Sequence, residues 1–171
     1  MKKTVLTWGL ISGGVAITMM LLTFPFHDRI GYDNSLILGY TTLVASALLI
    51  FFGVRSYREQ VAGGRLTFGK GFQVGVLIAL VASACYVGVW EIYYFTAKPD
   101  FCAKYTAHEL EKAKAAGADA AKLTEIEQQG EQMKKLLANP VTNAAMTFLE
   151  PFPIGLAASL ISAGILRRRR E

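Results

Sequence analysis

The sequence predicts an all-α, multi-pass membrane protein with four transmembrane helices and an external helical hairpin between spans three and four. Apolar residues make up 53% of the 171 residues and charged residues only 18%, whereas soluble domains average about 45–50% and about 25%. The apolar residues are concentrated in long stretches that lack charge, and Lys and Arg gather between alternate stretches. This distribution excludes a soluble enzyme domain, a nucleic-acid-binding domain and a disordered chain.

Four stretches without Asp, Glu, Lys or Arg mark the transmembrane helices. The first three are 20 or 21 residues long and the fourth is 16, and about 20 apolar residues cross a bilayer core as a helix. The first stretch is too long for a secretory signal and lacks an Ala-x-Ala cleavage pattern, which favours an uncleaved helix. Within one membrane domain of residues 1–171, we expect spans over residues 4–24, 35–54, 71–94 and 146–166.

The net charge alternates in sign along the chain. The N-terminus, segment 55–70 and the C-terminal tail carry +2, +3 and +3, whereas segments 25–34 and 91–150 carry −1 and −2. Because Lys and Arg accumulate in cytoplasmic loops, we expect both termini in the cytoplasm and segments 25–34 and 91–150 outside. Beside a membrane exit, the four arginines of the tail indicate topology and anionic lipid rather than nucleic acid.

The segment before span four has the composition of a water-exposed helical hairpin, over residues 104–138. Thr106 and Glu109 have capping-box spacing, which predicts a helix start at Thr106. Gly117 and Asp119 predict a stop followed by a capped second helix. That helix carries one thin apolar face, formed by Leu123, Ile126, Gly130, Met133 and Leu137. We expect this face to lie against the bundle or a partner.

The fourth transmembrane segment contains three prolines. Asn139 followed by Pro140 indicates a stop and a new helix start, so the helix should run from near Pro140 to Leu166. Pro151 and Pro153 remove backbone donors inside this stretch. We therefore expect a kink in its outer half.

Small residues recur at four-residue spacing along the spans, where they allow membrane helices to approach closely. They are Gly9, Gly13, Gly71, Gly75, Gly155 and Ser159. Packing within one four-helix bundle is the simplest interpretation, and homodimerisation through one of these faces is the alternative. Aromatic residues at the end of span three, Trp90, Tyr93, Tyr94 and Phe95, are typical of a belt at the lipid headgroups.

Two acids lie at the edges of spans. Glu91 and Glu150 fall at a similar, outer level of the bilayer when their positions are counted from the cytoplasmic ends of their helices. Ionisable residues at membrane depth are functional candidates, and a pair would form a cation or proton site. The simpler interpretation, which we favour, is that both carboxylates reach interfacial water or pair with Lys98, Arg29 or His27.

No sequence pattern predicts catalysis, a metal site or a cofactor. His27 and His108 stand outside any metal-ligand spacing, and no nucleophile motif, phosphate-binding loop or dinucleotide fingerprint occurs. Cys85 lies within span three and Cys102 beyond it, so a disulfide within the chain is not expected. Pairing of Cys102 between subunits is the alternative.

The order of several aromatic, Gly and Pro motifs resembles a bacterial family of four-span membrane proteins, domain of unknown function 4199. The motifs are Thr67-Phe68-Gly69-Lys70-Gly71, Tyr86-x-x-x-Trp90-x-x-Tyr93-Tyr94 and Asn139-Pro140-x-Thr142-x-x-x-Met146-x-Phe148-x-Glu150. The resemblance covers essentially the whole chain. It implies a bacterial inner-membrane location and a hairpin before span four, but no established activity and no functional residues.

Two functions follow from these observations. We expect a non-catalytic structural or interaction protein of the bacterial inner membrane, solvated by lipid, whose hairpin contacts a second copy or another envelope protein. The alternative is a small transporter or channel subunit that uses Glu91 and Glu150 beside the helix broken at Pro151 and Pro153. The absence of midplane charge and of visible inverted repeats favours the first.

Overall fold

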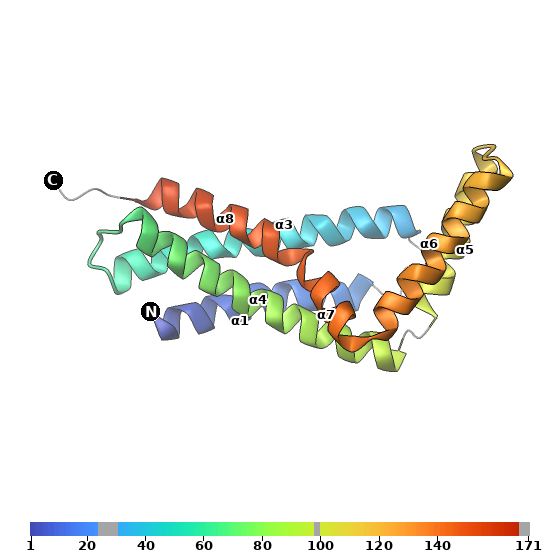
Figure 1. Ribbon diagram of the computed structural model, residues 1–171. Helices are drawn as coiled ribbons and strands as arrows, with labels where there is room; N and C mark the ends of the chain where they lie inside the picture. Colours follow the sequence, from blue (N-terminus) through green and yellow to red (C-terminus); the bar gives the residue numbers. More distant parts are fainter. Residues whose placement is uncertain (24–30, 98–99, 168–171) are drawn as a thin grey trace. The chain divides into compact units, whose positions relative to one another are not determined.

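The computed structural model describes residues 1–23, 31–97 and 100–167, which form helices and turns without a strand in these ranges. Figure 1 labels the helices: α1 (Lys2–Thr23), α3 (Tyr32–Gln60), α4 (Phe68–Ala97), α5 (Phe101–Ala115), α6 (Ala120–Ala138), α7 (Pro140–Phe148) and α8 (Pro151–Leu166). Four helical stretches are long and apolar enough to cross a membrane: Lys2–Thr23, Asp33–Gln60, Phe68–Ala97 and Pro140–Leu166. The predicted all-α class with four such helices is confirmed.

The helices extend past the stretches from which they were predicted. Helix α3 continues six residues beyond the predicted end at Val54, because charged residues at a span end stay in helical geometry and pair along the helix. The Arg55 Nε donates to Glu59 Oε1 at 2.9 Å in this last section. The predicted end of the first span at Phe24, His27 and the arginines after Arg167 lie outside the described residues.

The chain divides into two compact units, one of Met1–Gly88 with Phe148–Glu171 and one of Val89–Thr147. Helix α4 runs from the first unit into the second.

The first unit is a bundle in which α1, α3, the first part of α4 and α8 run alongside one another (Figure 1). Buried apolar side chains from all four helices form a cluster at one end of the bundle. They include Val5, Ile50, Val54, Tyr57, Val74, Ile78 and Leu166. Gly63 and Gly64, with φ of 62° and 81°, turn the chain between α3 and α4, a conformation that residues with a Cβ rarely adopt.

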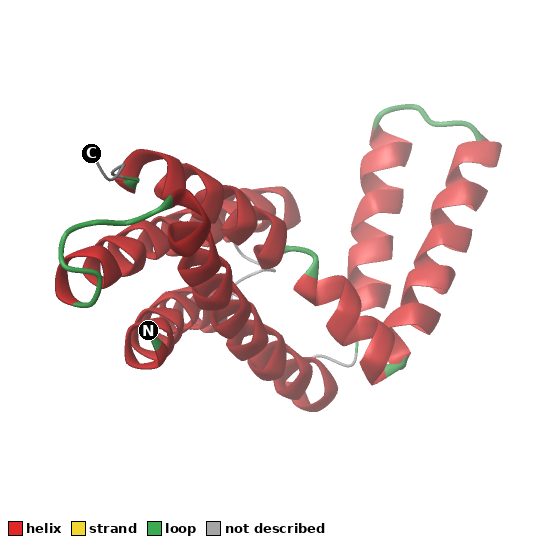
Figure 2. Cartoon of the chain, turned by 60° about the vertical axis from the view of Figure 1, so that its left-hand side comes forward, coloured by secondary structure: helices red, strands yellow, loops and turns green. Residues whose placement is uncertain are grey.

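In the second unit, α5 and α6 lie side by side as an antiparallel pair (Figure 2). Gly117 has a φ of 77° and follows the end of α5, and the Asp119 Oδ1 accepts from the Lys122 N–H at 2.8 Å to cap α6. The predicted stop and cap between these helices are therefore confirmed.

The predicted start of α5 at Thr106 is wrong, because α5 begins at Phe101. Thr106 lies inside the helix, where its side chain faces Gly130 of α6 so closely that a Cβ at Gly130 would collide with it. The hydroxyl therefore serves the contact between two helices rather than a helix end. The approach of α6 to α5 at this point depends on the missing side chain of Gly130.

The fourth span is interrupted, as its prolines predict. Helix α7 ends at Phe148, Leu149 and Glu150 form a turn, and α8 begins at Pro151. The new start at Pro140 is also confirmed, since the Asn139 Oδ1 accepts from the Val141 N–H at 2.9 Å. Pro at the first position of α7 and of α8 removes an N–H that has no intrahelical acceptor there.

Candidate functional site

Glu150 lies at the break between α7 and α8. It occupies the position that precedes Pro151, and its exposed side chain makes no capping hydrogen bond. Pro151 is half-buried and lines a small cavity inside the bundle, whereas Pro153 is exposed. Glu150 also lies within electrostatic range of the Tyr86 hydroxyl, which belongs to the same unit. The break therefore places a carboxylate beside the polar interior of the bundle.

Glu91 belongs to the second unit, near the end of α4. Its side chain is half-buried, and the Oε1 atom is shielded from solvent without a hydrogen-bond partner among the described residues. Glu91 and Glu150 belong to different units. The proposed pairing of the two carboxylates stays a prediction.

The middle of the bundle contains a reciprocal pair of serines. The Ser12 hydroxyl donates to the Ser46 carbonyl at 2.8 Å, and the Ser46 hydroxyl donates to the Ser12 carbonyl at 2.7 Å. Ser12 is 1% exposed and Ser46 is 5% exposed. The two hydroxyls thus satisfy each other and join α1 to α3 at a depth where lipid offers no hydrogen bond.

A small cavity of about 20 Å³ adjoins this serine pair. Its wall includes Ser83 and Tyr86 of α4 and Pro151 of α8, so helices α1, α3, α4 and α8 all contribute to it. Sequence analysis singled out Pro151 but none of the hydroxyls. Serine is common in membrane helices, and its partner on another helix cannot be identified from one sequence.

The small residues of the spans lie where helices of the bundle meet. A Cβ at Gly9 or Gly13 of α1 would meet Val81 or Ala82 of α4, and one at Gly71 would lie 3.4 Å from Ala163 of α8. One at Gly75 would lie 2.8 Å from the Ser159 Cβ, and one at Gly155 would lie 2.8 Å from the Ala79 Cβ. These positions hold α4 against α1 on one side and against α8 on another.

The second unit has a different kind of core, centred on a buried asparagine that sequence analysis missed. The Asn143 Oδ1 accepts from the Trp90 Nε1–H at 2.9 Å and from the Thr147 hydroxyl at 3.2 Å, while the Asn143 Nδ2 donates to the Leu137 carbonyl at 3.1 Å. Asn143 is 0% exposed. One amide therefore connects α4, α6 and α7, and a lone Asn in an apolar stretch is the only sequence signal for it.

Two of the aromatic residues expected at the headgroups are buried instead. Trp90 and Tyr94 lie in the core of the second unit, and the Trp90 ring packs edge-on against Phe101 with centroids 5.8 Å apart. These two rings therefore face protein in the second unit, and the belt at the headgroups stays a prediction. Tyr93 is half-buried and Phe95 is exposed.

Both cysteines are free thiols. Cys102 is buried, with its Sγ 3.5 Å from the Tyr94 hydroxyl, and Cys85 is half-buried in α4. Cys102 lies within the second unit's own core, a position that disfavours pairing between subunits.

Comparison with known proteins gives one family. The chain matches the family described as "Protein of unknown function (DUF4199)" over residues 7–168. The chain belongs to this family. Neither the curated proteins nor the solved structures contain a match. The family resemblance seen in the sequence is confirmed, and with the four apolar helices it describes a multi-pass membrane protein of the DUF4199 family.

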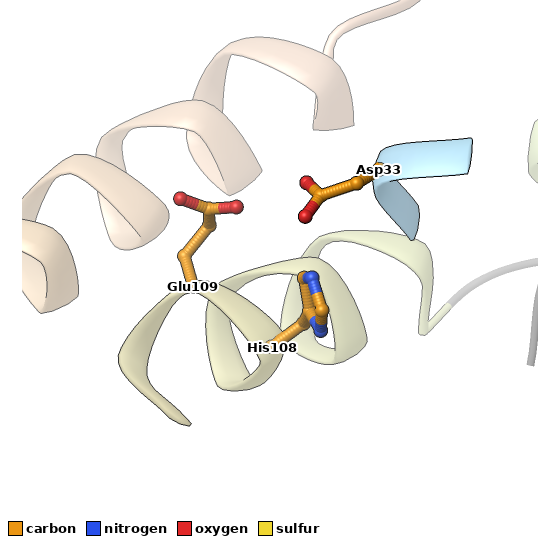
Figure 3. Close-up of side chains that lie close together, drawn as sticks. All are labelled: Asp33, His108 and Glu109. Carbon is orange, nitrogen blue, oxygen red and sulfur yellow. The ribbon is translucent and has the colours of Figure 1, made fainter. Parts of the chain in front are cut away.

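Figure 3 shows three potential metal ligands of this DUF4199 protein. His108 and Glu109 are consecutive, half-buried residues of α5, and Asp33 is an exposed residue in the first turn of α3. Asp33 belongs to the first unit and the other two to the second.

Proposed function

We propose that this DUF4199 protein is a non-catalytic interaction protein of the bacterial cytoplasmic (inner) membrane, with both termini in the cytoplasm. The charge distribution supports this threading, since the segments expected in the cytoplasm carry +8 and those expected outside carry −3. The non-catalytic part rests on the sequence, which contains none of the nucleophile or metal-ligand patterns considered above.

The surface proposed for contact is the face shared by α5 and α6. A cavity of about 190 Å³ opens between these helices, with apolar walls from Phe101, Tyr105, Ile126 and Met133 and polar groups from Glu109 and Gln129. This is the observation that carries the proposal, because an apolar recess with a few polar groups is the usual form of a binding surface. Met133 and Leu136 are also exposed, at 41% and 45%.

The partner in this proposal is a second copy of the chain or another envelope protein. The four apolar helices are solvated by lipid, and neither nucleic acid nor a cofactor takes part. A protein partner is favoured over a small ligand because an exposed apolar side chain of α6, Leu136, lies beyond the residues that line the cavity.

Cross-linking in intact membranes tests the proposal. A photoreactive amino acid is placed at Leu123 or Met133, on the recessed face, and at the exposed Gln128 as the matched control on the same helix. We expect one discrete adduct from Leu123 and Met133, identified by mass spectrometry as a second copy or one envelope protein, and none from Gln128. Absence of adducts from all three positions would contradict the proposal.

The transporter alternative is kept because one observation favours it. The break at Leu149 and Glu150 lies next to Pro151, which lines a cavity that also contains serine hydroxyls, and interrupted helices are common at transport sites. Purified protein in liposomes would then move protons or cations, and Glu91→Gln with Glu150→Gln would abolish the flux, while Glu127→Gln would not. Flux indistinguishable from empty liposomes would eliminate this alternative.

A further inference from the structure

A second cavity in the bundle lies at the end where α1 finishes and α3 begins. Its volume is about 60 Å³, three times that of the cavity beside the serine pair. Hydroxyl groups contribute much of its wall: Thr23, Ser35, Thr42 and Tyr86. The remaining wall is formed by small and apolar residues of α1 and α3.

The two cavities adjoin each other. Ala16, Leu43 and Tyr86 line both of them. Together these neighbouring cavities, here termed the hollow, extend from the level of Ser35 to the Ser12–Ser46 pair, which is about 16 Å along α3 at 1.5 Å per residue. Because the walls come only from α1, α3, α4 and α8, the hollow belongs entirely to the first unit.

The hydroxyls in this hollow have hydrogen-bonding capacity that the protein does not use. Ser35 is 4% exposed, and its Oγ has no partner among the described residues. Thr42 and Thr23 donate to the Leu38 and Met19 carbonyls of their own helices, which leaves the lone pairs of both oxygens open. Buried polar groups of this kind are satisfied by internal water where the space is polar and large enough.

The space is sufficient for water but for little else. A cavity needs about 10–15 Å³ of such volume to hold one water molecule, so each of the two cavities has room for at least one. Each site offers two or more hydroxyl oxygens, whereas cavities that stay dry are lined by apolar side chains alone. The ligand that fits is therefore water rather than an organic solute.

The hollow ends at the middle of the bundle. Ser12 lies at the midpoint of α1 and Ser46 at the midpoint of α3. Beyond them the bundle is filled by the apolar side chains of Val5, Ile50 and Val54, with Val74 and Ile78. The hydroxyl-lined hollow thus ends against an apolar section of the bundle.

From these observations we infer that the bundle contains a one-sided, water-filled vestibule, lined by Ser35, Thr42 and Tyr86 and closed at the Ser12–Ser46 pair. The inference is independent of the proposed contact surface on α5 and α6. In this inference, ordered water molecules hydrogen-bond to the buried hydroxyls and extend to half the depth of the bundle.

Silver ion tests the vestibule because it is about as small as water and binds thiolates, which form only where water is present. In a chain with Cys85→Ala and Cys102→Ala, we place cysteine at Ser35 or Thr42. The controls Ile37→Cys and Val44→Cys are on the same helix two residues further along, with side chains 67% and 50% exposed on the lipid-facing surface. Thiols that remain free after silver treatment are counted by alkylation of the denatured protein.

We expect silver to block the thiols of Ser35→Cys and Thr42→Cys about tenfold faster than those of their controls, as measured by the loss of alkylation. Equal rates at interior and control positions would overturn the inference. Reaction at Ser35→Cys alone would overturn it too, because Thr42 lies about 10 Å deeper along α3 and defines the vestibule.

A measurement on the unaltered chain covers the case in which a cysteine variant does not fold. Met20 lines the larger cavity and is only 6% exposed. Hydroxyl radicals produced from water by X-rays oxidise a methionine sulfur when water lies next to it. We expect Met20 sulfoxide to form at a rate comparable to that of the exposed Met133, and an unoxidised Met20 would overturn the inference.

Discussion

The two units of this chain are held together by different side chains. In the bundle, helices meet at glycines and serines, such as Gly75 against Ser159, and the buried serine pair joins α1 to α3. In the second unit, helices meet through aromatic rings around Asn143, whose amide bonds the Trp90 indole. One sequence of 171 residues therefore contains two distinct ways of building a helical core.

The difference follows from the environment in which each core forms. Lipid chains are as apolar as Leu, so helices in a membrane gain little from burying apolar side chains and rely on close approach and hydrogen bonds. Helices α5 and α6 are rich in Ala, Lys and Glu, so a contact such as the one that covers the Phe101 ring stabilises them by removing apolar surface from water. Substitutions in the two units should therefore destabilise the protein for different reasons.

The largest effect is expected from Gly75→Ile in the bundle. A Cβ at this position would lie 2.8 Å from the Ser159 Cβ, so α4 and α8 must separate, and overpacking of this kind costs about 3 kcal/mol. Gly164→Ile is the control because a Cβ at Gly164 meets nothing within 4 Å. Equilibrium unfolding in mixed micelles measures both, and equal stabilities would show that the close approach is unimportant.

Asn143→Leu should produce the next largest loss, about 2 kcal/mol, because the Trp90 N–H and the Leu137 carbonyl lose their partner. Ala145→Leu places the same side chain on the exposed face of α7 and should leave stability within about 0.5 kcal/mol. Hydrogen exchange should increase in α5, α6 and α7 but not in α1 or α3. Uniform acceleration over the whole chain would mean that the two units are not separate cores.

Removal of the serine pair should have a smaller effect. Ser12→Ala and Ser46→Ala should each destabilise the bundle by about 1 kcal/mol, and the double variant should cost less than the sum of the two. Thr41→Ala is the control, since the exposed Thr41 hydroxyl donates only within α3. Additive single effects would indicate that the two hydroxyls do not stabilise each other.

Asp119→Ala should have the smallest effect, about 0.5 kcal/mol, because it removes one N-cap from an exposed helix. Asp119→Asn keeps an acceptor oxygen and should restore most of the stability. The loss should appear as faster hydrogen exchange in the first turn of α6 only. Exchange that increases in α1 or α3 would contradict the separation of the units.

The features that depend on neighbouring residues in the sequence were predictable. Charge-free stretches set the four membrane helices, Asp119 set the cap of α6, and Pro140 and Pro151 set the breaks of the fourth span. Each of these effects acts within a few residues, and therefore the sequence is sufficient to identify them.

The features that depend on distant residues were not predictable. Ser12 and Ser46 are 34 residues apart and Trp90 and Asn143 are 53 apart, and nothing in either local sequence indicates the partner. Thr106 shows how a local pattern can mislead: its capping-box spacing is present, but the residue faces Gly130 inside α5. The pairing of Glu91 with Glu150 depends in the same way on tertiary structure.

The central claim is that α5 and α6 lie outside the cytoplasmic membrane as a contact surface, while the turn between α3 and α4 lies in the cytoplasm. Labelling of intact cells with a membrane-impermeant maleimide tests it most directly. In a chain with Cys85→Ala and Cys102→Ala, Gln128→Cys is expected to react at once and Arg65→Cys only after the membrane is permeabilised. Reaction of Arg65→Cys in intact cells, with Gln128→Cys protected, would contradict the account.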